Sequence, residues 1–200
     1  AASDVYKRQY IDIGKSSECI LVDQNYIYVS NWSGNSSITV LEKNNLEIVA
    51  TIETAPEPSE MVLDKAGQVW VICSGGYLNE DYPELITIDP FLLEITQTLR
   101  FGVKECSPSE LVINSTRDTL YYINDDIFRL SYNDSELPLI PFIESDDRNF
   151  YRLGFDNSMN TIIATDALDY VQKGYFYIYS QTGSELGKYR AGIIPGKINN

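Results

Sequence analysis

Three Ser-Glu pairs recur along the chain, and each opens a short apolar run. The pairs are Ser17-Glu18, Ser59-Glu60 and Ser109-Glu110. Carboxylates repeated in this way could gather around one point and hold a polar ligand or an ion. They could also accept hydrogen bonds from neighbouring backbone amides or pair with basic side chains, and repetition in a repeat protein favours this structural role. Both roles remain open from the sequence.

The other reactive side chains do not form a catalytic pattern. The chain has no histidine, which removes imidazole-based acid–base chemistry and imidazole metal ligation. Its cysteines, Cys19, Cys73 and Cys106, therefore lack the partner that activates a thiol nucleophile. Adjacent carboxylates such as Asp125-Asp126 have no spacing that specifies a glycosidase, and no Asp-x-Asp-x-Asp-Gly calcium loop occurs. We expect no enzyme activity, no cofactor and no metal site.

The composition narrows the classes of partner. With 15 basic and 29 acidic residues, the net charge is −14. This charge argues against nucleic acid, whose phosphates need Lys and Arg, and against attraction to an anionic membrane surface. Hydrophobic residues make up 44% of the chain, enough for a packed core, yet no apolar run approaches the ~20 residues of a membrane helix. A small molecule or another protein is the expected partner.

The sequence around the Ser-Glu pairs repeats as a unit of four short strands. Aligned units open at Ser17, Ser59, Ser109, Tyr151 and Gly196, with spacings of 42, 50, 42 and 45 residues. We call the first two residues of each unit its opening pair. Four strands every ~40–50 residues are typical of β-propeller blades. We therefore predict an all-β propeller with four complete four-stranded blades at 17–58, 59–108, 109–150 and 151–195, plus terminal stubs, as part of a ring of about seven blades.

The strands within each unit are short and rich in β-branched and aromatic residues. In the third unit we expect them at 110–113, 119–123, 127–131 and 137–142. Trp70 lies in the middle of a strand, so we expect it in the core between blades. Cys73 and Cys106 map to one face, where a disulfide is conceivable, although free thiols are the simpler expectation.

Particular motifs make the chain resemble the YVTN-type (YncE-like) β-propeller repeat family. That family combines a Tyr-Val-x-Asn strand end, an Ile-Asp strand end, a run such as "vvatI" and a Pro-x-Gly/Glu lead-in. The matching segments are Tyr28-Val29-Ser30-Asn31, Ile88-Asp89, Ile48-Val49-Ala50-Thr51-Ile52 and Pro56-Glu57-Pro58-Ser59-Glu60. The resemblance covers about residues 10–198, and the third and fourth units match only in pattern.

The resemblance implies a place and a role. The repeat sequence is similar to that of propellers among outer-membrane surface lipoproteins of Gram-negative bacteria. Some of those proteins capture cobalamin for an outer-membrane transporter. It implies a non-enzymatic propeller at the periplasm or outer-membrane surface, with a small ligand or an envelope protein as partner. Two alternatives stay open. One is a lactonase-like or quinoprotein-like enzyme whose catalytic blades lie outside this chain, and the other is a scaffold for protein partners.

The family's geometry turns the repeat into a map of candidate residues. In a propeller the blade connections and the loops between second and third strands share one face, at the mouth of the central channel. The second residue of each opening pair should lie around this mouth. These residues are Glu18, Glu60, Glu110, Arg152 and Lys197. The loops add the aromatic candidates Trp32, Tyr77, Tyr82 and Tyr170. These rings could stack on a flat or sugar-like ligand, or could fold over blade edges.

The first nine residues have the character of an artefact. The segment Asp4–Gln9 is the translation of GATGTGTATAAGAGACAG, which resembles the end sequence used by transposase-based sequencing-library kits. We exclude residues 1–9 from the fold. We expect that the native protein continued upstream, where an export signal or lipid anchor would lie.

Overall fold

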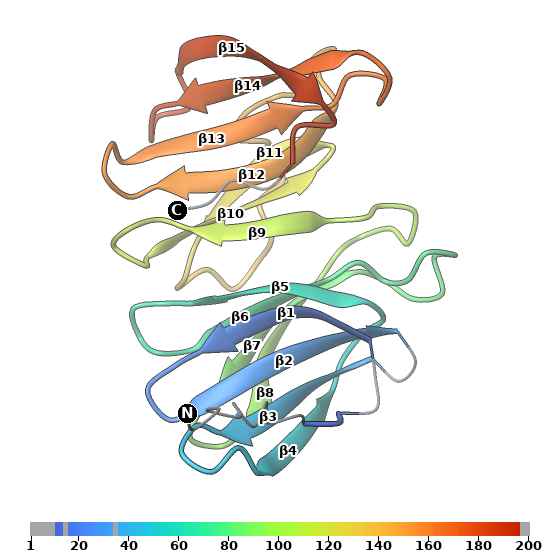
Figure 1. The fold of residues 1–200 in the computed structure, drawn as a ribbon, viewed down its shortest axis with the longest axis vertical. Coiled ribbons are helices and arrows are strands. Elements are labelled where there is room, and N and C mark those ends of the chain that lie inside the picture. The colour runs from blue at the N-terminus through green and yellow to red at the C-terminus, as the bar shows by residue number, and fades with distance from the viewer. Residues whose placement is uncertain (1–10, 14–15, 34–35, 197–200) are drawn as a thin grey trace, which may run out of the picture.

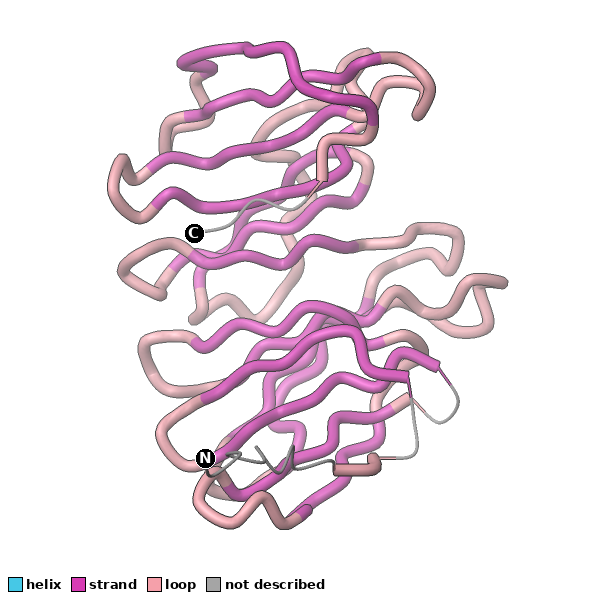
Figure 2. Tube along the Cα trace, in the orientation of Figure 1, coloured by secondary structure: helices cyan, strands magenta, loops and turns pink. Residues whose placement is uncertain are grey.

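The computed structural model describes residues 11–13, 16–33 and 36–196, and within them all regular structure is β. Figure 2 shows strands joined by loops and turns, with no helix in the described part of the chain. The strands form four antiparallel sheets that follow one another along the longest axis of the molecule (Figure 1). Residues 1–9 and Lys197, which the sequence singled out, lie outside the described residues.

Three of the sheets have four strands in sequence order. The first contains β1 (Ser16–Val22), β2 (Tyr26–Ser33), β3 (Ser37–Glu42) and β4 (Ile48–Glu53). The second contains β5 (Pro58–Leu63), β6 (Val69–Cys73), β7 (Glu84–Asp89) and β8 (Glu94–Arg100). The fourth contains β12 (Phe150–Asp156), β13 (Thr161–Asp166), β14 (Lys173–Tyr179) and β15 (Glu185–Ile193).

The third sheet has only three strands: β9 (Ser109–Ile113), β10 (Thr119–Asn124) and β11 (Asp126–Ser131). The fourth strand expected at 137–142 is wrong, because this segment contains Pro138 and Pro141, which lack the N–H group that a strand donates. A single bridge remains at its end, where the Ile127 amide donates to the Ile143 carbonyl at 3.0 Å. The other three sheets have the four strands predicted for a blade.

Side chains from facing sheets build three cores, one between each pair of neighbours. Alternating strand residues point to opposite faces, so one sheet contributes to the core on either side of it. Trp70 is 1% exposed in the core between the second and third sheets, as predicted, and its indole Nε1 donates to Asp64 Oδ2 at 2.9 Å. The three cysteines are free thiols.

The inner strands β1, β5, β9 and β12 lie next to one another in that order, so the sheets pack like successive propeller blades. The first and fourth sheets stand at opposite ends of the stack (Figure 1). This open arrangement fits part of a larger ring. No helix in the described part of the chain is long and apolar enough to cross a membrane.

Candidate functional site

The blade openings and several loops surround one cavity of about 310 Å³, which we call the mouth cavity. It lies where β5, β9 and β12 begin, beside the end of β2 and the segments that follow β6 and β13. Its lining residues come from all four sheets or the loops attached to them: Trp32, Glu57, Ser59, Glu60, Ser74, Ser107, Pro108, Ser109, Glu110, Phe150, Tyr151, Arg152 and Tyr170. Five of the eight candidates from the sequence therefore share one cavity.

A backbone irregularity recurs at the start of every inner strand. The pairing of β1, β5, β9 and β12 with the next strand shifts register at or beside the opening pair. In a regular strand, side chains point alternately to the two faces of the sheet. A bulge interrupts this alternation and changes the direction of the side chains next to it. At Glu110 the backbone also has a φ of 60°, a left-handed conformation that is uncommon for residues other than Gly. Three of the opening residues at these irregularities, Glu60, Glu110 and Arg152, line the mouth cavity.

The opening glutamates link consecutive blades through backbone amides. Glu60 Oε2 accepts the amide of Glu110 at 3.1 Å, and Glu110 Oε2 accepts the amide of Leu153 at 3.3 Å. Each carboxylate thus satisfies a backbone donor on the next inner strand. The structural role expected for these glutamates is therefore present at Glu60 and Glu110.

An ion pair joins Glu110 to Arg152, and both residues line the mouth cavity. Arg152 Nη1 donates to Glu110 Oε1, and the two side chains are 39% and 9% exposed. Burial raises the pKa of Glu110, and the nearby charge of Glu60 raises it further, while Arg152 offsets part of this rise. The pair is therefore a half-buried, largely neutralised unit rather than a free charge that faces solvent.

Aromatic rings form another wall of the mouth cavity. The Arg152 guanidinium lies 4.6 Å from the centroid of the Tyr151 ring, and Tyr151 meets Tyr170 edge to face at 5.9 Å. Trp32 and Tyr170 remain 42% and 49% exposed, so their rings are open to a ligand.

Three candidates do not line the mouth cavity. Tyr77 is 85% exposed. Tyr82 contacts cations instead, with Arg100 Cζ and Lys104 Nζ at 5.7 and 5.3 Å from its ring centroid. Glu18 is exposed at the start of β1, the inner strand of the first sheet. Of the four aromatic candidates, Trp32 and Tyr170 line the mouth cavity, and Tyr77 and Tyr82 lie outside it.

Sequence reasoning missed two important lining residues, Glu57 and Tyr151. Tyr151 takes the position that Ser holds in the first three units. When the units are aligned with one another, this change from Ser to an aromatic residue is visible in the sequence. Glu57 precedes its opening pair and has a φ of 57°. Its carboxylate accepts the Ser74 hydroxyl at 2.7 Å and the Tyr77 amide at 3.0 Å, so it ties the loop after β6 to the mouth.

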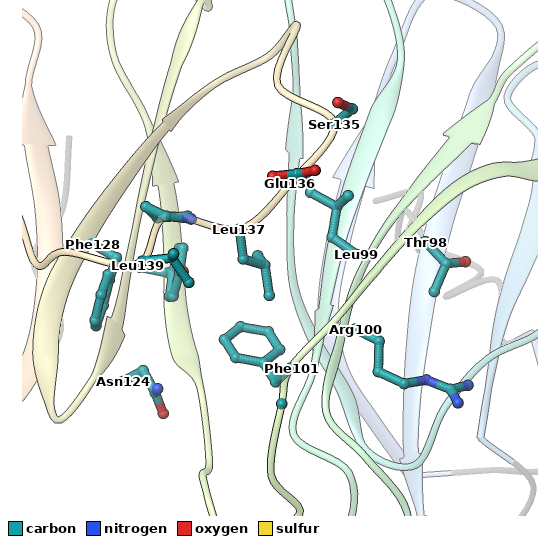
Figure 3. Close-up of a pocket in the computed structure, with 13 residues that line it drawn as sticks. Thr98, Leu99, Arg100, Phe101, Asn124, Phe128, Ser135, Glu136, Leu137 and Leu139 are labelled. Carbon is teal, nitrogen blue, oxygen red and sulfur yellow. The ribbon is translucent and has the colours of Figure 1, made fainter.

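A second cavity, of about 480 Å³, lies at the outer rim between the second and third sheets. Figure 3 shows Leu99, Phe101, Leu137 and Leu139 around its centre, with the Arg100 side chain to one side. It opens where the segment after β11 fails to form a fourth strand. None of the candidate residues lines it. Among the described residues, no group of three or more His, Cys, Asp and Glu side chains could hold a metal ion.

The sheet architecture defines a β-propeller, and comparisons with known proteins agree. No family model and no curated protein matches the chain. Solved propeller-like structures do match. Kuenenia stuttgartiensis hydrazine synthase has a TM-score of 0.71 at 14% identity, covering 92% of this chain and 53% of that one. A quinoprotein alcohol dehydrogenase-like protein from Bacteroides thetaiotaomicron has a TM-score of 0.70 at 15% identity, covering 86% and 45%.

A candidate 6-phosphogluconolactonase from Bacteroides uniformis gives a third match, with a TM-score of 0.66 at 17% identity, covering 90% of this chain and 59% of that one. At such low identity these likenesses show the fold alone. The chain spans about half the length of the structures it matches.

Proposed function

We propose that this chain belongs to a non-enzymatic propeller that binds a small ligand in the mouth cavity. One observation carries the proposal: loop aromatics and opening residues from separate units line the same cavity. Its volume of about 310 Å³ is at the lower end of the ~300–1,000 Å³ usual for small-molecule sites. Exposed rings beside fixed polar groups supply both contact area and orientation for a ligand.

The resemblance to YVTN-type repeats extends the proposal to a cell-envelope role. In that role the protein captures a small nutrient at the periplasm or outer-membrane surface and presents it to an envelope protein, such as an outer-membrane transporter. Cobalamin is the narrowest candidate. A whole cobalamin molecule is larger than the mouth cavity of about 310 Å³, so the cavity would hold an edge or a side group of it.

Ligand-induced stabilisation tests the proposal. We expect at least one of cobalamin, choline, glucose and adenosine to raise the melting temperature, because a ligand at 100 times its Kd adds about 2.7 kcal/mol to the free energy of unfolding. Tyr170→Ala should abolish the shift, since Tyr170 lines the mouth cavity. Tyr77→Ala is the matched control and should keep it, because Tyr77 is 85% exposed and outside that cavity.

Two results would contradict this account. If none of the four compounds stabilises the protein at millimolar concentration, a scaffold for protein partners becomes the better interpretation. If Tyr77→Ala abolishes the shift and Tyr170→Ala does not, the ligand lies on the loop after β6 and not in the mouth cavity.

The alternative is a propeller enzyme. One observation favours it: several solved structures with the same fold are described as enzymes or enzyme-like proteins. They include a dehydrogenase-like protein and a lactonase candidate. In that case the described residues would contribute binding groups, and the catalytic groups would come from blades beyond this chain. Turnover of a lactone by the completed protein would favour this alternative over the binding role.

A further inference from the structure

The mouth cavity has more acidic than basic side chains on walls that are partly aromatic. From this combination we infer that its ligand is an organic cation, such as a substituted ammonium. The inference rests on the proposed function, because it names the chemical class of ligand for that same cavity.

The charge balance of the lining residues is the first argument. Three carboxylates, Glu57, Glu60 and Glu110, face a single cation, Arg152, which is committed to Glu110. The other two carboxylates accept hydrogen bonds from neutral donors: Glu57 from the Ser74 hydroxyl and the Tyr77 amide, and Glu60 from the Ser59 hydroxyl and the Glu110 amide.

With three carboxylates and one guanidinium, the lining carries a formal net charge of −2, although Arg152 also attracts Glu60. A concave surface with one sign of charge concentrates ligands of the opposite sign. The net charge of −14 for the whole chain acts in the same direction.

The aromatic wall is the second, independent argument. The cavity already holds one cation against a ring, since the Arg152 guanidinium lies 4.6 Å from the Tyr151 centroid. Trp32 and Tyr170 also have electron-rich aromatic rings, and these residues are 42% and 49% exposed. A cation over the face of Trp or Tyr is attracted by the ring quadrupole, most strongly when water is excluded. These two rings offer an organic cation the surface that Tyr151 offers Arg152.

Other ligand charges fit the lining less well. An anion would depend on Arg152, whose charge Glu110 already offsets, and would face the carboxylates of Glu57 and Glu60. A neutral ligand would use the rings but gain nothing from the uncompensated carboxylates.

Calorimetric titration of the full chain with three molecules of one shape tests the inference. The probes are choline, the neutral alcohol in which carbon replaces its nitrogen, and the carboxylate tert-butylacetate. We expect choline to bind about tenfold more tightly than the neutral alcohol, within the range of cation–π and charge effects. Its affinity should fall as salt rises from 0.01 to 0.15 M, because the screening length shortens from about 30 to about 8 Å.

Two variants assign the effect to the cavity. Glu60→Gln keeps the shape and an acceptor for the Glu110 amide but removes the charge, and should weaken choline binding about fivefold without changing the neutral alcohol. Glu84→Gln is the control, because Glu84 is a carboxylate paired with Arg100 at 2.7 Å and does not line the cavity. It should leave choline binding unchanged.

The outcomes separate the inference from the proposed function. Equal affinity for choline and the neutral alcohol, or tighter binding of the carboxylate, would overturn the cation while leaving a small-ligand cavity. If choline fails but glucose, adenosine or cobalamin binds and Tyr170→Ala abolishes that binding, the inference is wrong and the proposed function stands. If none of these compounds binds, both are wrong.

Discussion

Replacing Trp70 by Ala should lower the free energy of unfolding by about 4 kcal/mol, the usual cost of deleting a buried aromatic side chain. Trp70 is 1% exposed and packs between the second and third sheets. Its loss leaves a cavity there and also removes the indole donor of the buried Asp64 carboxylate. Since domains of this size are stable by roughly 5–15 kcal/mol, about a quarter to four-fifths of the stability would disappear. Chemical denaturation followed by circular dichroism measures the change.

The matched control is Trp32→Ala, the same substitution at the only other tryptophan. Trp32 is 42% exposed at the mouth cavity, so its loss should change the free energy of unfolding by less than about 1 kcal/mol. Similar losses for the two variants would mean that the cores between blades are not arranged as described.

Glu110→Ala should cost about 3 kcal/mol of stability, the second-largest effect that we expect. The substitution leaves the Arg152 guanidinium without its carboxylate and the Leu153 amide without its acceptor. Removing Glu110 is expensive even where the intact pair adds little, because the part-buried Arg152 loses its counter-charge and the buried Leu153 amide loses its acceptor. Equilibrium unfolding at neutral pH measures the loss.

Glu84→Ala provides the comparison, since its partner Arg100 is 59% exposed and such surface pairs contribute less than about 1 kcal/mol. A double variant, Glu110→Ala with Arg152→Ala, should lose less than the sum of the single variants, because the two side chains interact. Additive losses, or an effect at Glu110 no larger than at Glu84, would contradict the blade-linking role of Glu110.

The positions of the blades could be predicted from the sequence, because short apolar and aromatic-rich strands are recognisable in local segments and recur in each unit. The third sheet departs from the prediction at 137–142. The strand was predicted there from the apolar residues Leu137, Leu139 and Ile140, although the sequence also shows two prolines in this segment. Leu139 is 96% exposed. An apolar residue there contributes nothing to the core, so hydrophobicity alone was a misleading signal.

Two kinds of candidate could be predicted for the mouth cavity: opening residues that the repeat positions, and the loop aromatics Trp32 and Tyr170. Glu60, Glu110 and Arg152 meet because their units place them at equivalent points. Tyr82 could not be assigned, because its contacts with Arg100 and Lys104 depend on a loop without a counterpart in the other units. Which carboxylate would pair with Arg152 also depends on spacings between blades, and these have no local sequence signature.

The most direct test of ligand binding at the mouth cavity uses the two indole N–H signals in an NMR titration with choline. Trp32 lies at the cavity and is 42% exposed, whereas Trp70 is 1% exposed and bonded to Asp64. We predict a saturable shift of the Trp32 signal with the Trp70 signal unchanged. A Trp32 signal that stays in place while choline binds, as judged by calorimetry, would contradict the assignment of the ligand to the mouth cavity.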